Sequence, residues 1–325
     1  MDFTLTDEQR ALRDSARTLL ARECPSALVR ARYADPAARA EQLWKHVVAS
    51  GWAALTVPEA HGGLSMSVIE LALICQEAGR VLAPVPLWET AGLAVPLLRE
   101  VGTPELQAEW LPRIASGEAT ATALVGDLAP EAHAVDLVLV AGDGDDTLDL
   151  GGEVTPLGSL DATRVLCEVP GARRVAGPRV DRALEEATVA LCAEMVGAAR
   201  WVLDTTVAYA KEREQFGVPI GSFQAVKHKL ADMLLDVERA EAATFYAAMC
   251  VAADDADRSR AVSVAKASAG DAGRRAAKDG IQIHGGIGFT WEHDLHLYIR
   301  RLYADEPLLG TADVHRDRLA ALVLD

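Results

Sequence analysis

Three long helical segments in the second half of the chain constrain its fold most. Apolar residues at helical spacing predict a first helix that begins after Asp181 and reaches Arg213. A second follows Ser222, which we expect to cap it, and a third ends near His284. The first has a near-continuous apolar surface and the third is rich in alanine, so both favour close helix packing. Residues 180–325 are therefore predicted to form an antiparallel four-helix bundle.

The first 118 residues also show helical patterns. Thr6, Ser67 and Thr103 each stand where a side chain can cap the first turn of a helix. The predicted helical spans between and after these caps include 37–50, ended by Gly51, and 87–101. This part is predicted to be a helical domain.

Residues 119–179 have a different pattern, in which short apolar runs alternate with glycine and proline. The runs at 135–140 and 164–169 predict strands. The acidic stretch Gly142–Asp146 lacks the spaced ligands and final glutamate of a calcium loop, so we expect a solvated hairpin turn. The chain is thus predicted to be mainly α with a small β domain.

Composition excludes several classes of function. The 325 residues are half hydrophobic, enough for a large core, and the net charge of −16 disfavours nucleic acid and anionic membranes as partners. No long apolar run or leader is visible, so we expect a cytoplasmic protein without a membrane span. The five cysteines are far apart and are expected to be buried thiols. His293, Asp294 and His296 lack a third ligand at metal spacing, so no metal site is predicted.

A glycine cluster follows the third long helix. Gly285 and Gly286 leave backbone N–H groups open to a phosphate, and Gln282 stands one helical turn before them. The basic pair Arg300-Arg301 follows on the next segment. Trp291, in between, is expected to pack against other side chains and not to stack on a nucleotide. Together these residues predict a site for a phosphate-bearing ligand.

These residues belong to three motifs at fixed spacing. They are Arg213-x-x-Phe216-Gly217, then Gln282-x-x-Gly285-Gly286-x-Gly-Phe, then an arginine followed by Leu309-Gly310-Thr311. In this combination the chain resembles the acyl-CoA dehydrogenase family. The resemblance spans most of the chain and implies an N-terminal helical domain (1–118), a middle β domain (119–179) and a C-terminal bundle (180–325). The β segment looks shorter than in full-length relatives, and the flavin-contacting motifs of that domain are not recognisable.

The resemblance also implies a cofactor, FAD, that is shared at a subunit interface. It assigns the pyrophosphate to Arg213, the adenosine side to Phe216, and amide contacts to Gln224 and Gln282. Close backbone approach falls to Gly285 and Gly286. Thr311 resembles a hydroxyl donor beside the ring system.

The family's proton-abstracting glutamate has no counterpart here. It stands either before Gly-Thr, where this chain has Leu309, or on the first bundle helix, where the aligned residue is Ala187. We therefore expect no catalytic residue, and only Glu306 stays open as a displaced base. Other nearby carboxylates, Glu185, Glu186, Glu194 and Asp305, are expected to be solvated or capping charges.

A short subunit without a base implies a partner. The resemblance points to the α2β2 heterotetramers of actinobacterial steroid and CoA-thioester catabolism, in which a full-length subunit completes the FAD site. The reaction implied is α,β-desaturation of an acyl-CoA, with electrons passed to an electron-transfer flavoprotein. Two alternatives stay open: an autonomous homotetramer that uses Glu306, and a non-catalytic scaffold subunit.

Overall fold

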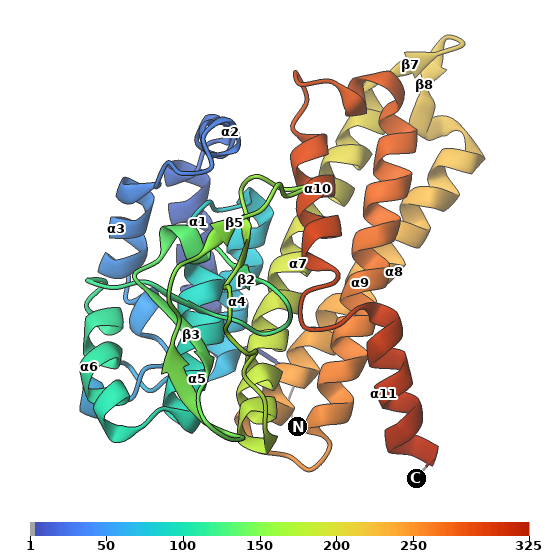
Figure 1. Cartoon of the computed structure of the whole chain (residues 1–325). Coiled ribbons are helices and arrows are strands. Elements are labelled where there is room, and N and C mark those ends of the chain that lie inside the picture. The colour runs from blue at the N-terminus through green and yellow to red at the C-terminus, as the bar shows by residue number, and fades with distance from the viewer. Residues whose placement is uncertain (1–3, 325) are drawn as a thin grey trace.

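The computed structural model describes residues 4–324, and helices dominate it (Figure 1). The N-terminal part contains α1 (Asp7–Glu23), α2 (Ser26–Ala34), α3 (Glu41–Ala49), α4 (Val68–Val81), a π-helical segment (Trp88–Ala94) that continues into α5 (Val95–Val101), and α6 (Pro104–Ala115). The three predicted caps are confirmed, because the hydroxyls of Thr6, Ser67 and Thr103 each accept a hydrogen bond from a backbone N–H of the first turn.

Two details of this part differ from the predictions. The helix expected at 37–50 begins only at Glu41, and α2 forms a separate helix that was not predicted. The first half of the helix expected at 87–101 is π-helical, and every residue from Trp88 to Ala94 is buried.

The middle part is a small β structure, as predicted. Its strands are β1 (Ala121–Ala123), β2 (Ala129–Pro130), β3 (Leu137–Ala141), β4 (Leu148–Leu150), β5 (Thr155–Pro156) and β6 (Leu166–Glu168). β1 pairs parallel with β3, which pairs antiparallel with β4, and β6 lies between β2 and β5. The turn at 142–147 is a hairpin connection, but Asp146 is not merely solvated. Its Oδ1 accepts hydrogen bonds from the N–H groups of Arg179 (2.7 Å) and Val180 (2.9 Å), at the start of the next helix.

The C-terminal part is the predicted antiparallel bundle. Its helices are α7 (Pro178–Glu212), α8 (Gln224–Ala252), α9 (Arg258–His284), α10 (Leu295–Asp305) and α11 (Ala312–Leu324). Ser222 does not cap α8, because its hydroxyl donates to the Pro219 carbonyl (2.7 Å) and Phe223 takes the cap position. Thr311 does cap α11, accepting from Val314 N–H (3.2 Å). A short hairpin of β7 (Glu214–Gln215) and β8 (Val218–Pro219), which was not predicted, joins α7 to α8.

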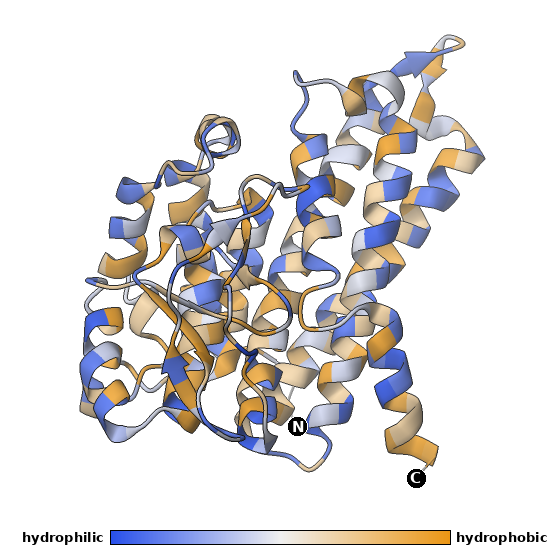
Figure 2. Cartoon of the chain, viewed as in Figure 1, coloured by the Kyte–Doolittle hydropathy of each residue, from blue (hydrophilic) through white to orange (hydrophobic). Residues whose placement is uncertain are grey.

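The core runs between α4 and α7, where two glycines let the helices approach. A Cβ on Gly197 would lie 1.9 Å from the Gln76 carbonyl oxygen, and one on Gly79 would lie 2.0 Å from that of Glu194. The residues that these helices bury in the core are largely hydrophobic, and Figure 2 shows hydrophobic and hydrophilic stretches alternating along the helices of the molecule. All five cysteines are free and buried, as predicted.

Candidate functional site

Most of the predicted cofactor residues gather at one end of the bundle, near the β7–β8 hairpin (Figure 1). Arg213 directly follows α7, and the Tyr209 ring one turn earlier stacks on His284 with ring centres 4.4 Å apart. Gln224 begins α8, which runs antiparallel to α9 and is tied to it by a Lys229–Asp279 ion pair (2.6 Å). Arg213, Phe216, Gln224, Gln282, Gly285 and Gly286 therefore share this end.

The turn at Gly285 and Gly286 and the side chain of Arg213 are both accessible to solvent. Gly285 has φ +63, and a Cβ on Gly285 or Gly286 would meet no atom within 4 Å. Arg213 is exposed, and within residues 4–324 no carboxylate forms an ion pair with its guanidinium. An unpaired guanidinium beside bare backbone fits a pyrophosphate.

Phe216 protrudes from the tip of the hairpin. Phe216 is 94% exposed, and its ring makes an edge contact with Phe223 (ring centres 6.2 Å apart). Its φ is +56, a left-handed conformation that is uncommon for a bulky residue, and Gly217 follows at φ +77. Such strain and exposure mark a side chain that is held ready for a contact with another molecule.

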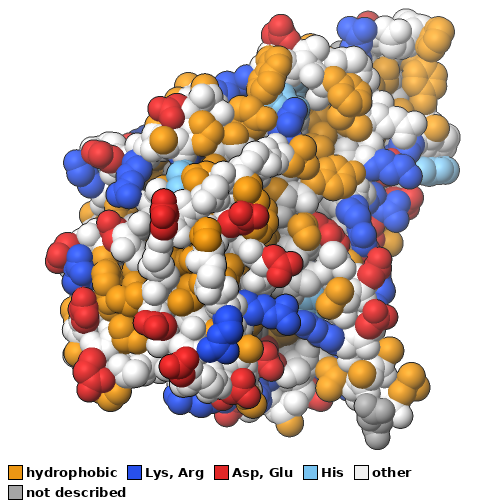
Figure 3. Space-filling view, in the orientation of Figure 1, with side chains coloured by type: hydrophobic (Ala, Val, Ile, Leu, Met, Phe, Trp, Pro, Cys, Tyr) orange, Lys and Arg blue, Asp and Glu red, His pale blue; other side chains and the backbone are white. Residues whose placement is uncertain are grey.

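Further apolar side chains are exposed at this end. Phe289 is 71% exposed, and Trp291, which was expected to pack against other side chains, is 58% exposed. One edge of Trp291 does contact Tyr33 (5.4 Å between ring centres), but most of the ring faces solvent. Figure 3 shows hydrophobic side chains gathered at the upper end of the bundle.

Thr311 lies elsewhere. The carbonyl before it, Gly310 O, accepts a hydrogen bond from Lys266 Nζ (2.8 Å), in the first half of α9. Because Lys266 precedes Gln282 by sixteen residues, the two positions are about 24 Å apart along the helix. The structure therefore does not bring Thr311 together with the other predicted cofactor residues.

The turn before Thr311 carries Leu309 at φ +59. Lys266, which is fully buried, donates to the carbonyls of Glu306 (2.6 Å) and Gly310 on either side of it, and burial lowers the pKa of this ammonium. The Glu306 carboxylate accepts from Ala312 N–H (3.0 Å) at the start of α11 and lies 3.6 Å from Arg274. Glu306 is thus engaged as a capping charge.

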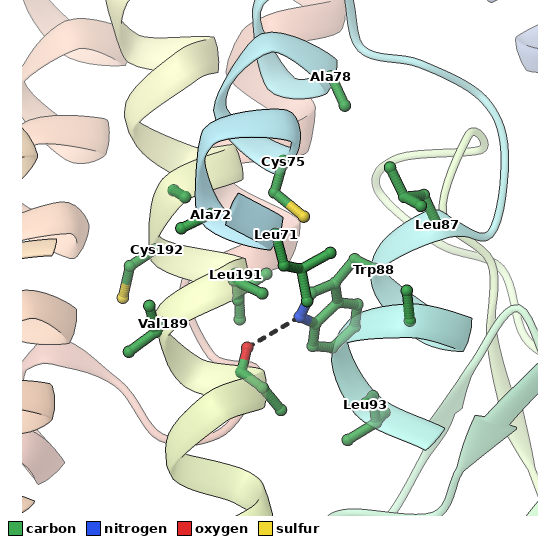
Figure 4. Packing of buried hydrophobic residues seen from close by; sticks show 14 of the residues in the cluster. Leu71, Ala72, Cys75, Ala78, Leu87, Trp88, Leu93, Val189, Leu191 and Cys192 are labelled. Carbon is green, nitrogen blue, oxygen red and sulfur yellow. Dashed lines mark hydrogen bonds between the residues drawn. The ribbon is translucent and has the colours of Figure 1, made fainter. Parts of the chain in front are cut away.

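The alternative base position, Ala187, is packed against other side chains. Ala187 is fully buried in α7, and its carbonyl accepts a hydrogen bond from Trp88 Nε1 (2.9 Å; Figure 4). The Trp88 ring in turn lies 5.0 Å from the guanidinium of Arg164. The space beside Ala187 is therefore filled by the indole.

Arg164 belongs to a buried group of charges that the sequence did not predict. This junction cluster consists of Glu89, Asp161, Arg164, Glu194, Arg301 and Asp305, none of them more than 5% exposed. Arg164 donates to Glu89 (2.9 Å), Glu194 (2.9 Å) and Asp305 (2.6 Å), and Arg301 donates to Asp161 and Glu194 (2.5 Å each).

The cluster corrects three expectations. Glu194 and Asp305 are not solvated or capping charges, and Arg301 is not free to bind a phosphate, because all three are buried in ion pairs. A signal for Glu194 was present, since it is the one charge in the otherwise apolar run from Val189 to Ala199.

Burial raises the pKa of these carboxyls, whereas pairing with an arginine lowers it. Burial raises the pKa of Glu89 to about 7 and that of Asp305 to about 6, although Arg164 opposes both shifts. For Asp161 and Glu194 the arginines outweigh burial, and the pKa of each is lowered.

No helix in residues 4–324 is long and apolar enough to cross a membrane. The same residues contain no cluster of three or more side chains suited to a metal ion.

Comparison with known proteins identifies the family. Residues 6–118 match the family model for the acyl-CoA dehydrogenase N-terminal domain, and residues 178–324 match that for the C-terminal domain. The chain is 36% identical to acyl-CoA dehydrogenase IpdE2 of Mycobacterium tuberculosis over 94% of both chains.

Among solved structures, the chain is similar to the ChsE4-ChsE5 complex from Mycobacterium tuberculosis (TM-score 0.91, 28% identity, covering 100% of this chain and 99% of that one). It is also similar to the Tcur3481-Tcur3483 steroid ACAD G363A variant (TM-score 0.88, 28% identity, 99% of both chains). The chain belongs to the acyl-CoA dehydrogenase family, whose members are oxidoreductases acting on a CH–CH bond.

Proposed function

We propose that the chain is a non-autonomous subunit of a flavin-dependent acyl-CoA dehydrogenase. It pairs with a full-length subunit in an α2β2 heterotetramer and contributes contacts to an FAD that the partner mainly holds. The observation that carries the proposal is a contrast within one chain. The open end of the bundle retains an unpaired arginine beside a bare glycine turn, whereas both base positions, Leu309 and Ala187, are aliphatic.

The chain's own residues would hold the cofactor by charge and close approach. Arg213 would pair with the pyrophosphate, Gly285 and Gly286 would offer backbone N–H groups, and Gln224 and Gln282 would offer amides. Phe216 would cover the adenosine side and so exclude water from it. Thr311 would need a different portion of a flavin, since the adjoining Ala312 packs on Gly270, which is about 18 Å from Gln282 along α9. When bound, the flavin supplies the acceptor for a hydride from the β-carbon.

The proton is taken by the partner in this proposal. A base must reach the α-carbon of the thioester in a dry site, and neither Leu309 nor Ala187 can accept a proton. The substrate is an acyl-CoA, and the similarity to a steroid acyl-CoA dehydrogenase favours a bulky, steroid-derived acyl group. Electrons then pass to an electron-transfer flavoprotein.

Flavin retention tests the proposal. Co-expression with the partner is expected to give about one FAD per heterodimer, and Arg213→Ala is expected to lower that content because a desolvated charge pair with the pyrophosphate is lost. Arg260→Ala, which removes an exposed arginine near the start of α9, is the matched control. Absorbance of the purified complexes measures flavin per protein. Unchanged flavin content in Arg213→Ala would reject this role of the bundle end.

A displaced base is the second candidate. An autonomous homotetramer would need Glu306 to swing out of its bond with Ala312 N–H. Activity of the single chain that Glu306→Gln abolishes would establish that alternative. We expect no such activity.

A scaffold role is the third. Full activity and flavin content of the partner subunit purified without this chain would favour it. The open arginine and glycine turn speak against it, because a pure scaffold has no use for an unpaired charge there.

A further inference from the structure

The junction cluster joins the three parts of the molecule. Glu89 comes from the π-helical segment, Asp161 and Arg164 from the loop that precedes β6, Glu194 from α7, and the remaining two residues from α10. The loop at 157–165 reaches the helices through three buried side chains, since Thr163 also accepts from Arg301 (2.7 Å). Leu160, directly before Asp161, is 52% exposed. The junction cluster therefore holds the 157–165 loop against the helices.

Hydrogen bonds within the cluster leave two oxygens without a donor. Both oxygens of Glu194 accept from arginine, and those of Asp161 accept from Arg301 and Thr163. Glu89 and Asp305 each use one oxygen for Arg164, and their other oxygens, Oε2 and Oδ2, are buried and unpartnered. An ionised carboxylate with an unpaired buried oxygen is costly, whereas a protonated one carries no charge.

The surroundings do not supply the missing positive charge. Glu131 adds a fifth buried carboxylate and is paired with Arg32 (2.5 Å). Lys266 faces Asp305, but its ammonium donates to backbone carbonyls. Cys75, which also faces the cluster, is a buried thiol whose pKa is raised, so it is neutral. Glu131 and Arg32 neutralise each other, so within the junction cluster four buried carboxylates face two arginines, Arg164 and Arg301.

We propose that the junction cluster is a proton-dependent latch, which holds the 157–165 loop against α7 and α10 while Glu89 and Asp305 each carry a proton. Loss of these protons leaves uncompensated negative charge inside the cluster. The loop then opens more often, because its departure lets water reach the charged Glu89 and Asp305, which stay on their helices.

The direction of the pH effect follows from the raised pKa of both groups. Each carboxyl binds its proton more tightly in the closed state than in water, so the latch is firmest below the ordinary carboxyl pKa. It weakens as the pH rises, through about 6 for Asp305 and about 7 for Glu89. Between the ordinary and the raised pKa, each retained proton makes the opening constant rise about tenfold per pH unit.

Hydrogen exchange of the full chain, in complex with its partner, tests this. Amides of residues 157–168 are expected to lose protection between about pH 5 and about pH 8, after correction for the chemical exchange rate, whereas α4 and α8 are not. Glu89→Gln and Asp305→Asn, which replace a protonated carboxyl by a neutral amide of the same shape, should flatten that dependence. Glu153→Gln, at an exposed carboxylate, is the control and should behave as the parent.

A second measurement needs no variant. Infrared difference spectra between the same two pH values should show the carbonyl band of a buried protonated carboxyl at the lower pH and its loss at the higher. Absence of that band, or equal loss of protection in the parent and Glu89→Gln, would overturn the proposal.

Discussion

Gly197 offers the sharpest test of how this chain packs. An alanine Cβ there would lie 1.9 Å from the Gln76 carbonyl oxygen and 3.0 Å from Arg80 N, both backbone atoms of α4. Ordinary contact begins at 3.4 Å, so α4 and α7 would have to separate by about 1.5 Å where they are most deeply buried. A backbone atom cannot relieve the clash by a change of rotamer, as a side chain can. Overpacking of a core costs about 1–3 kcal/mol of stability. We expect Gly197→Ala to lower the free energy of unfolding by about 3 kcal/mol.

Urea denaturation followed by circular dichroism measures this change, with the m-value expected to stay constant. Gly152→Ala is the matched control, since a Cβ there meets no atom within 4 Å and the backbone is not left-handed. The control should stay within about 0.5 kcal/mol of the parent. A Gly197→Ala protein as stable as the control would refute the packing argument.

Three other outcomes can be checked. Asp146→Ala should lower the free energy of unfolding by about 1 kcal/mol, measured in urea, because two N–H groups at the start of α7 lose their acceptor. Phe216→Asn should leave the chain as stable or up to about 1 kcal/mol more stable, since asparagine tolerates a left-handed backbone, yet weaken assembly with the partner in sedimentation. A thiol reagent should label none of the five cysteines before unfolding and all of them in urea, because burial raises the pKa of Cys24 and Cys192 to about 12. Labelling of the native chain would contradict this.

Helices could be predicted from the sequence where a capping residue marks the start of the helix. Thr6, Ser67 and Thr103 cap helices as their sequence contexts indicate, because a cap depends on residues within one turn. α2 was missed since it is short and begins after Pro25 without a side-chain cap. Ser222 looked like a cap, but a 3₁₀ turn turns its hydroxyl towards Pro219. Cap signals are therefore ambiguous where a second local turn competes for the same hydroxyl.

Buried charge could not be predicted in this way. Arg164 bonds to Asp305, 141 residues away, and to Glu89, 75 residues before it. No local pattern links three such positions, so Asp305 was expected to be a solvated or capping charge and Glu89 was not singled out. The residues at the end of the bundle were easier to predict from the sequence. Arg213, Gln282, Gly285 and Gly286 follow a spaced motif and lie at helix ends. Thr311 belongs to the same set of motifs but lies away from this end of the bundle. A motif fixes the order of residues along the chain and not the distance between them in the fold.

The hairpin of β3 and β4 sets a lower limit on how far the middle of such a chain can shrink. Asp146 at its tip supplies the acceptor for the opening turn of the longest helix, and Gly177 lies against that carboxylate so closely that a Cβ would come within 2.5 Å of it. Deleting the hairpin would leave α7 to fray from its first residue. A minimal version of this fold must therefore keep 137–150 even if the remaining strands are removed.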